Sequence, residues 1–308
     1  MRTVGRRLAT VVLAVVTLVA VPACRSGDEA PVAKSDPEAV TVASFSFSES
    51  RTLAEIYAQL LESRGFEVER ALDLASREVA EPALEQGAVD LLPEYLGTAL
   101  AFVEGGPPGP APGRDEAHER LRRAFAGRGV TVLAAAAAEN KNGFVVTRST
   151  ADRLELRTVS DLRPVAGQLA LGGPPECPSR RFCLQGLRDT YGLEFRRFEA
   201  LDVSGPLTVA ALEGGDVDVA MLFTSNGNLG RGDFVLLEDD RGLQPPENVV
   251  PVVRTEVAER HPALAGIVDQ ATAELKGEDL VTLNRRVDID RLSPAAAAEE
   301  WLRAHGLV

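Results

Sequence analysis

The residues best suited to binding a small molecule follow a repeated sequence pattern. The pattern Leu-Glu-x-Gly-x-Val-Asp occurs at Leu84–Asp90 and Leu212–Asp218, and an aromatic residue follows each Asp at the same interval, Tyr95 and Phe223. In each copy we predict a helix, a glycine that ends it, and a buried strand. The repeat indicates two lobes of similar design, each offering an aromatic side chain to a shared cleft. The alternative is a coincidence of common local patterns.

Further polar candidates follow the first copy of the pattern. Pro93 cannot donate to a sheet ladder, so we expect the strand Val89–Leu92 to stop before it. Glu94, Tyr95 and Thr98 would then lie beyond the carboxyl end of a strand, where open α/β sheets bind ligands.

The residue sets of common enzymes are missing from the sequence. It contains no GxxxxGK[ST], GxSxG or HExxH motif. His118, His261 and His305 fall in predicted surface helices or at their ends, so we expect neither a His-based triad nor a zinc site. Asp216 and Asp218 lack the pattern of a calcium loop. We therefore expect no enzyme activity, no cofactor and no metal.

Composition excludes one further class. The 308 residues suffice for one large or two ordinary domains, and a hydrophobic content of 45% supports real cores. The formal net charge of −13 argues against a nucleic-acid partner, because that function needs a basic face.

The N-terminus has the pattern of an export signal. Arg2, Arg6 and Arg7 precede an apolar run, Leu8–Val21, that is too short for an ordinary membrane-spanning helix. The run ends in Val-Pro-Ala-Cys24, which resembles a bacterial lipobox. We predict a signal peptide over 1–23, a lipid anchor on Cys24 and a tether over 24–38, which places the protein on the extracytoplasmic face of the membrane. The alternative is an ordinary signal peptide with an incidental cysteine.

Two cysteines remain if Cys24 carries lipid. An exported, oxidising context favours a disulfide between Cys177 and Cys183. Two reduced thiols, or a bond from Cys24 to one of them, are the alternatives.

The order of predicted elements favours an α/β fold with two lobes. The order strand–helix–strand–helix–strand over Val40–Leu92 predicts a parallel sheet, and Ser48 or Ser50 is the expected cap of its first helix. A second α/β run begins near Glu139, and the strand Val249–Val253 returns to the first lobe. We assign 39–138 plus 249–308 to lobe 1 and 139–248 to lobe 2.

Several ordered blocks resemble one known family. SFSFSES at Ser44–Ser50, PALEQGAVDLLPEYLGTAL, GGPPECPSRRFCLQGLRDTYGL at Gly172–Leu193 and LEDDRGLQPPENVVPVV are similar to substrate-binding proteins of osmoprotectant ABC importers. These proteins bind glycine betaine, choline and related quaternary amines. The resemblance implies a two-lobed type II periplasmic-binding-protein fold that closes on its ligand in a cleft between the lobes, a monomer, and an ABC permease as partner.

The resemblance also implies ligand contacts. Tyr95 and Thr98 match the family's EYxGT motif, where the Tyr belongs to an aromatic cage and the Thr touches the ligand carboxylate. Glu176 and Arg180 match a Glu-x-x-x-Arg motif, where the Arg binds that carboxylate. Phe223 aligns with an aromatic position of the family.

The chain departs from the family at three places. Phe45, just past the first strand, stands where a Lys is common, which removes a carboxylate partner and adds an aromatic candidate. Asn142 replaces a Tyr in the crossover segment, where it is our candidate ligand contact, and another cage Tyr has no match near Pro206–Leu207.

These features together predict a solute-binding lipoprotein that delivers a quaternary amine or zwitterionic compatible solute, such as glycine betaine or choline, to an ABC permease. One alternative is the same fold binding another zwitterion, such as a proline-like solute. A sensory or scaffold lipoprotein without a transport ligand is the alternative of a different class, and an exported hydrolase comes third.

Overall fold

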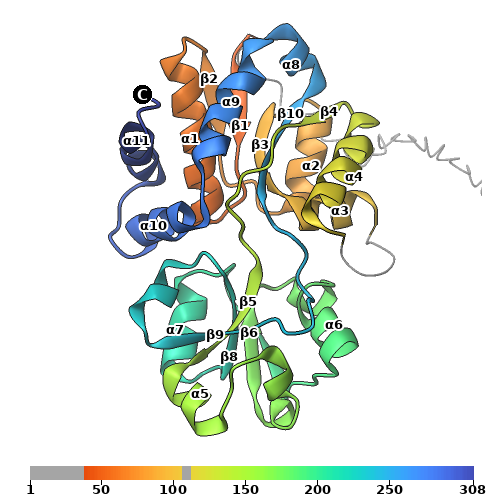
Figure 1. Ribbon diagram of the computed structural model, residues 1–308, viewed down its shortest axis with the longest axis vertical. Helices are drawn as coiled ribbons and strands as arrows, with labels where there is room; N and C mark the ends of the chain where they lie inside the picture. Colours follow the sequence, from red (N-terminus) through yellow and green to blue (C-terminus); the bar gives the residue numbers. More distant parts are fainter. Residues whose placement is uncertain (1–37, 106–111) are drawn as a thin grey trace, which may run out of the picture. The chain divides into compact units, whose positions relative to one another are not determined.

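The computed structural model describes residues 38–105 and 112–308 of the chain. Their strands form two five-stranded sheets, in the orders β2-β1-β3-β10-β4 and β7-β6-β8-β5-β9 (Figure 1). The first sheet contains β1 Val40–Ala43, β2 Val68–Ala71, β3 Leu91–Tyr95, β4 Val130–Val132 and β10 Val249–Arg254. The second contains β5 Asn142–Thr147, β6 Ala170–Gly173, β7 Arg197–Ala200, β8 Val219–Phe223 and β9 Phe234–Leu237.

The two sheets have the same topology, which confirms the predicted α/β class. In the first, β1 pairs in parallel with β2 and β3, while β10 runs antiparallel to β3 and β4. In the second, β6 pairs in parallel with β7 and β8, while β5 runs antiparallel to β8 and β9. Tyr95 and Phe223 therefore end the equivalent strands β3 and β8.

The aspartates of the repeated sequence pattern make the same bonds in both sheets. Asp90 donates its backbone N–H to the Thr41 carbonyl at 2.8 Å, and its carboxylate accepts the Thr41 N–H at 2.9 Å. Asp218 does the same with Ala170, at 3.0 and 2.8 Å. Each aspartate thus joins the start of one strand to the start of its parallel neighbour, so the repeat has a structural reason.

Helices cover both sheets. One hydrophobic core joins the first sheet to its helices, and two smaller cores flank the second. The helices of the first core are α1 Ser48–Ser63, α2 Arg77–Glu85, α3 Leu96–Val103, α4 Arg114–Ala126, α8 Thr255–Arg260, α9 Ala263–Glu274, α10 Gly277–Asp288 and α11 Pro294–Ala304. The second sheet carries α5 Arg148–Leu154, α6 Leu184–Gly186 and α7 Pro206–Gly214, with 3-10 turns at Val159–Leu162, Ala166–Gln168, Cys177–Ser179 and Gly227–Arg231 and a π-turn at Leu187–Tyr191.

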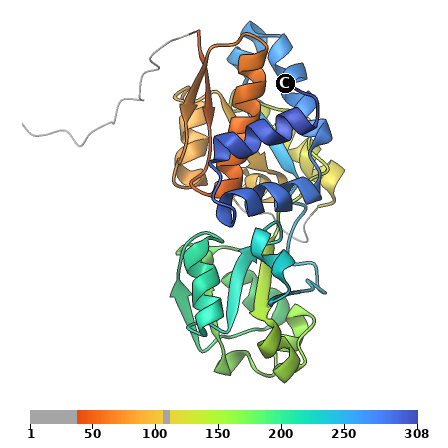
Figure 2. The ribbon, with the colours of Figure 1, turned by 90° about the vertical axis from the view of Figure 1, so that its left-hand side faces the viewer.

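Helix α1 organises the first core. Its apolar face is buried, and α11 packs across it (Figure 2). Trp301 of α11 is buried in this core, and its indole N–H donates to Asp279 of α10 at 3.0 Å. The helices after β10 therefore fix the position of α1.

The prediction that Pro93 ends its strand is wrong. Strand β3 continues through Pro93 to Tyr95 and pairs with β10, where Pro93 lies opposite Pro251. Neither proline has an N–H, so this pair occupies a place in the antiparallel ladder where no N–H is required of either. Glu94 and Tyr95 are consequently the last residues of the strand, and Thr98 lies in the first turn of α3.

The predicted cap of α1 is also wrong. Phe47 occupies the N-cap position, and no side chain there bonds to the helix. The Ser50 hydroxyl instead accepts the backbone N–H of Phe45 at 2.9 Å. This bond fixes the loop between β1 and α1, which holds Phe45 and Phe47.

Two segments of the chain cross from one sheet to the other, between β4 and β5 and between β9 and β10. They pair at an antiparallel bridge between Glu139 and Asn248, and the Asn140 N–H donates to the Glu247 carbonyl at 2.9 Å. The lobe boundaries predicted at 138/139 and 248/249 fall in this region and stay a prediction.

Within the described part of the chain, no helix combines the length and the apolar character needed to cross a membrane.

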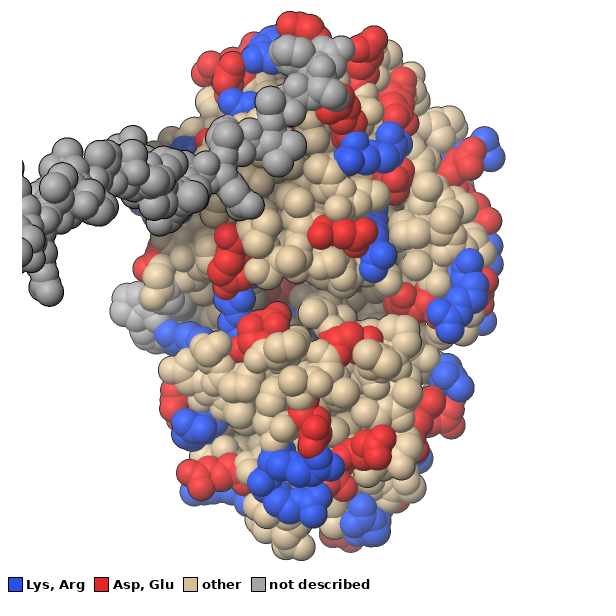
Figure 3. Space-filling model, turned by 180° about the vertical axis from the view of Figure 1, so that it is seen from behind, with Lys and Arg blue, Asp and Glu red and all other residues tan. Residues whose placement is uncertain are grey.

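On the face shown in Figure 3, acidic and basic side chains are interspersed.

Candidate functional site

Three aromatic side chains contact Phe47, and we call Phe45, Phe47, Tyr95 and Phe223 the aromatic cluster. The Phe47 ring centroid lies 6.1 Å from that of Phe45, which it stacks on, 6.0 Å from that of Tyr95 and 5.2 Å from that of Phe223. Phe45 and Tyr95 are buried, whereas Phe47 and Phe223 are half-buried. Aromatic faces attract cations, so the cluster suits a positively charged group without N–H donors.

The fold explains how these rings meet. Phe45 and Phe47 follow the end of β1, Tyr95 ends the neighbouring strand β3, and Phe223 ends β8 of the other sheet. Carboxyl ends of parallel strands meet at one edge of a sheet, which is where α/β proteins bind ligands. The predicted aromatic residues therefore do come together, through Phe47.

A buried carboxylate, Glu49, lies behind the cluster and is 3% exposed. One of its oxygens accepts the Tyr95 hydroxyl and the Asn140 amide, both at 2.7 Å. The other accepts the Ser225 hydroxyl at 2.5 Å and the Asn284 amide at 2.6 Å. Burial, followed by the nearby charge of Glu49, raises the pKa of Tyr95 well above its ordinary value of 10.0, so the phenol stays a neutral donor.

A cavity of about 130 Å³ adjoins the cluster. Its volume is below the roughly 300–1,000 Å³ typical of sites for drug-sized ligands, which favours a small molecule. Its lining includes Phe47, Glu49, Ser204, Phe223, Asn284 and Asp288.

Thr98 takes part in a buried network of charges. Its hydroxyl donates to Glu247 at 3.3 Å and accepts from Arg77 at 3.0 Å. Arg77 also binds the carboxylate of Glu94 through two bonds of 2.8 Å and lies over the Phe45 ring, 5.4 Å from its centroid. The role of Thr98 as a ligand contact stays a prediction, since its hydroxyl already has two protein partners.

Two carboxyl groups of this network have raised pKa values. Burial raises the pKa of Glu247 to about 8, against the lowering effects of Arg77 and of hydrogen bonds from Thr98. Burial, followed by the charge of the neighbouring Glu94, also raises the pKa of Glu81, which is 1% exposed.

Arg180 pairs with a carboxylate from the first sheet's helices. Its guanidinium donates to Glu78 of α2 at 2.5 Å, and the two side chains are 37% and 49% exposed. An exposed pair of this kind is weak enough for a ligand carboxylate to compete with it. The predicted contact between Arg180 and the ligand stays a prediction.

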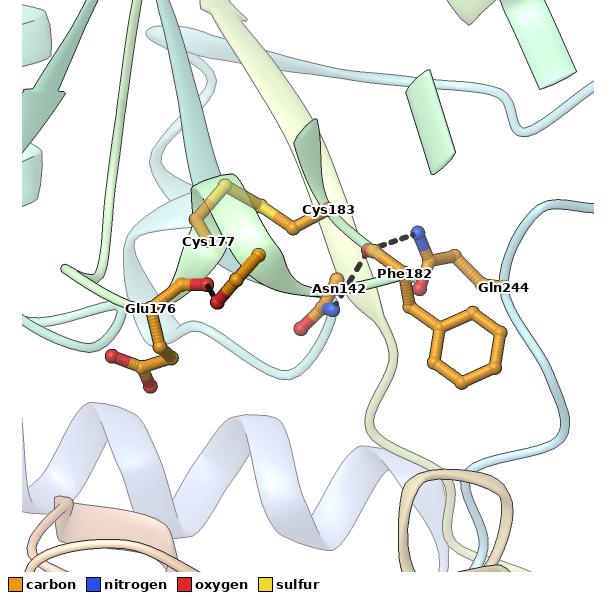
Figure 4. Close-up of a disulfide and its surroundings, with 7 residues drawn as sticks. Asn142, Glu176, Cys177, Phe182, Cys183 and Gln244 are labelled. Atoms are coloured by element: carbon orange, nitrogen blue, oxygen red, sulfur yellow. Dashed lines mark hydrogen bonds between the residues drawn. A yellow bond between two sulfur atoms is a disulfide. The ribbon is translucent and has the colours of Figure 1, made fainter. Parts of the chain in front are cut away.

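The predicted disulfide between Cys177 and Cys183 is confirmed, with the Cα atoms 5.2 Å apart (Figure 4). The loop that it closes is held at the Phe182 carbonyl, which accepts the amides of Asn142 at 3.1 Å and Gln244 at 3.0 Å. Asn142 therefore fixes the cysteine loop in this structure, and its predicted ligand contact stays a prediction.

Glu176, at the start of the same loop, is half-buried, and its backbone carbonyl accepts the Ser179 hydroxyl at 3.0 Å. Figure 4 shows its carboxylate pointing away from the disulfide. Its role as a ligand contact stays a prediction.

Sequence reasoning missed Phe47 and Glu49. The pattern Phe45-Ser46-Phe47 after β1 could have indicated Phe47, because loops are rich in Gly, Pro, Asn, Asp and Ser, and two aromatic residues so close together are unusual there. Glu49 gave no signal, since an acid in the first turn of a helix is ordinary.

Cys24 lies outside the described residues. In the ranges 38–105 and 112–308, no three His, Cys, Asp or Glu side chains are grouped to hold a metal ion.

Comparison with known proteins finds relatives among the binding proteins of solute transporters. The chain is 29% identical to a glycine-betaine-binding protein of Pseudomonas aeruginosa, over 88% of this chain and 89% of that one. It is 26% identical to a carnitine transport binding protein of Listeria monocytogenes, over 87% of each chain. Among solved structures, a glycine betaine/carnitine/choline ABC transporter protein is 26% identical with a TM-score of 0.72, over 87% of this chain and 99% of that one.

The architecture agrees with these similarities, because the two five-stranded sheets of this chain fit the two-lobed fold of its structural neighbours. A family model for the substrate-binding domain of ABC-type glycine betaine transport systems matches residues 38–304, and the chain belongs to that family.

Proposed function

We propose that this protein binds a small quaternary amine or zwitterion, such as choline or glycine betaine, at the aromatic cluster and hands it to an ABC permease. The observation that supports this most directly is the contact of the Phe47 ring with rings from both sheets. A quaternary ammonium group has no N–H to donate, so its recognition depends on aromatic faces and apolar contact. Each cation–π pair contributes about 0.5–2 kcal/mol.

The relatives support the same substrate class, since their names refer to glycine betaine, carnitine and choline. A carboxylate on the ligand suits a bidentate arginine, and Arg180 is the candidate in this chain. The protein acts as a monomer and catalyses no reaction in this proposal. Its role is to capture the solute outside the cytoplasm and deliver it.

Calorimetric titration of the full mature chain tests the proposal. Choline, glycine betaine, carnitine and proline are titrated separately, and we expect at least one quaternary amine to bind. Binding of proline alone would favour the alternative of a proline-like solute. Absence of heat and of thermal stabilisation with all of them would contradict the proposal.

Membrane attachment belongs to the same proposal and depends on Cys24, the last residue of the Val-Pro-Ala-Cys sequence. We expect metabolic labelling with a fatty acid to mark the wild-type chain and to fail for Cys24→Ser, which should be released or remain unprocessed. The Cys177→Ser/Cys183→Ser variant is the control and should keep the label. Equal labelling of Cys24→Ser would contradict the anchor.

A further inference from the structure

Glu49 is a buried carboxylate that no Lys, Arg or His of the described residues neutralises through an ion pair. Its four partners, from Tyr95, Asn140, Ser225 and Asn284, are neutral donors. Two bonds to each oxygen fill the acceptor capacity of an ionised carboxylate. A buried carboxyl group loses its hydrogen bonds to water and needs protein donors in their place, so the position of each donor matters.

The four donors come from four separate segments. Tyr95 ends β3, Asn140 lies in the first crossover segment, Ser225 follows β8, and Asn284 belongs to α10. Glu49 itself lies in the first turn of α1. One carboxylate thus joins the first sheet and its helices, the crossover, and the end of a strand in the second sheet.

Ser225 is the donor from the second sheet, and it is held twice. Its hydroxyl donates to Glu49, and the Asn284 amide donates to the Ser225 carbonyl at 2.9 Å and hydroxyl at 3.1 Å. Ser225 is 2% exposed and lies two residues after Phe223. Holding Ser225 therefore holds the end of β8 that presents the Phe223 ring to Phe47.

We propose that Glu49 is a positioning residue that couples ligand binding to the joining of the two lobes. It acts through Tyr95, whose ring it fixes by the hydroxyl, and through Ser225, which it ties to the helices of the first sheet. The ligand would meet rings from both lobes in the arrangement that this carboxylate stabilises. The inference rests on the proposed function for its ligand and on the four bonds for its geometry.

Three variants separate these roles. Ser225→Ala removes the donor of the second sheet and leaves Glu49 its other three partners. Glu49→Gln removes the charge at nearly constant size. Tyr95→Phe keeps the ring and removes only the hydroxyl. Ser63→Ala is the matched control, because its hydroxyl bonds to the Leu60 carbonyl inside α1.

Affinity for the quaternary amine that binds wild type best is the first readout. Loss of a hydrogen bond to a charged group weakens binding about tenfold or more, and we expect this for Ser225→Ala and Glu49→Gln but not for Ser63→Ala. The double variant Glu49→Gln/Tyr95→Phe should bind no more weakly than the worse of its single variants, because the Tyr95 hydroxyl acts through its bond to Glu49. If Glu49 had only a structural role, its substitution would lower the melting temperature without changing the affinity for the ligand, and the effects of the two substitutions on affinity would show no coupling.

The second readout needs no ligand. Spin labels on cysteines introduced at the exposed positions Glu67 and Asp152 report the distance between the two lobes. We expect a broader distance distribution in Ser225→Ala and Glu49→Gln than in wild type or Ser63→Ala. An unchanged distribution overturns the inference, and so does a broader distribution with unchanged affinity. If wild type binds no ligand of the class, the proposed function fails, and the distance distribution alone decides whether Glu49 joins the lobes.

Discussion

Glu247 accepts hydrogen bonds from the backbone N–H and the hydroxyl of Thr98, at 3.2 and 3.3 Å, although the two residues are 149 positions apart. The same oxygen accepts the Gly97 N–H at 3.2 Å, so the carboxyl group lies at the N-terminus of α3. A Cβ on Gly97 would lie 2.5 Å from the Pro245 side chain, which only glycine avoids. Gly97 and Thr98 therefore dock α3 against the second crossover segment.

This contact predicts a pH dependence of stability. The pKa of Glu247 is raised from 4.5 to about 8 by burial, so the folded protein keeps a proton that the unfolded chain loses above pH 4.5. The folded state binds more protons between these values, and the free energy of unfolding falls as pH rises through that window, by up to about 1.4 kcal/mol per pH unit. Glu247→Gln should reduce this slope, as measured by urea unfolding between pH 5 and pH 8.

The comparison needs a control, because the raised pKa of buried Glu81 adds a slope of the same sign. Substitution of the exposed Glu194 by Gln should leave the wild-type slope in place. Equal slopes for wild type and Glu247→Gln would show that Glu247 is ionised in both states.

The aromatic cluster predicts a loss of affinity that is separate from stability. Phe223 is half-buried, so Phe223→Ala should destabilise the protein by less than the roughly 3–5 kcal/mol of a fully buried Phe. Its contact with a cationic ligand is worth about 0.5–2 kcal/mol, and calorimetry should show that loss.

Phe66→Ala is the matched control for this variant. Phe66 is also half-buried and contacts His261. It follows the C-terminal end of α1, whereas the aromatic cluster lies at the N-terminal end, and the 16 residues of α1 span about 24 Å. It should lower the melting temperature and leave affinity unchanged. The same loss of affinity in both variants would mean that Phe223 acts through the fold.

Local patterns predicted much of the fold. The order strand–helix–strand–helix–strand over Val40–Leu92 follows from periodicity and turn residues, because short-range spacing decides such elements. The repeated Asp identified the equivalent strands, since each Asp repeats the same local bonds. The continuation of β3 through Pro93 could not be predicted, because it depends on a partner proline far along the chain.

The site was only partly predictable for the same reason. Tyr95 and Phe223 were found because they sit at fixed distances from the repeated pattern. The partners of Glu49 come from residues up to 235 positions away, and nothing local to α1 indicates them. Burial of an acidic side chain depends on the tertiary structure. The sequence can therefore identify the aromatic residues of a site without identifying the carboxylate that holds them in place.

The pair Arg180–Glu78 predicts how the site discriminates between ligands. If Arg180 meets the ligand carboxylate, Glu78 competes for the same guanidinium. Arg180→Ala should then weaken glycine betaine and leave choline unchanged, because choline has no carboxylate, while Glu78→Gln should strengthen glycine betaine. Both variants should change stability by only about 0–1 kcal/mol, since the pair is exposed.

Calorimetry with both ligands on each variant measures this effect. Arg188 is an exposed arginine in the turn Leu187–Tyr191, just after the cysteine loop. Arg188→Ala is the control and should change the affinity for neither ligand. Equal weakening of choline and glycine betaine by Arg180→Ala would show that Arg180 supports the loop and does not read the carboxylate.

The disulfide predicts a split between stability and binding. Cys177 and Cys183 close a loop with a sequence separation of 6, for which chain entropy gives roughly 2 kcal/mol. The loop is also held at the Phe182 carbonyl by Asn142 and Gln244, so the double variant Cys177→Ser/Cys183→Ser should fold.

Its main effect should be on ligands that use Arg180, which lies inside the loop. We expect affinity for glycine betaine to fall more than affinity for choline, because only the former depends on the position of that guanidinium. Asn142→Ala removes one of the two bonds to Phe182 and should act in the same direction, more weakly, with the disulfide intact. Unfolding in urea and calorimetry with both ligands separate the two effects. A double variant that loses several kcal/mol of stability but keeps both affinities would show that the disulfide serves the fold alone.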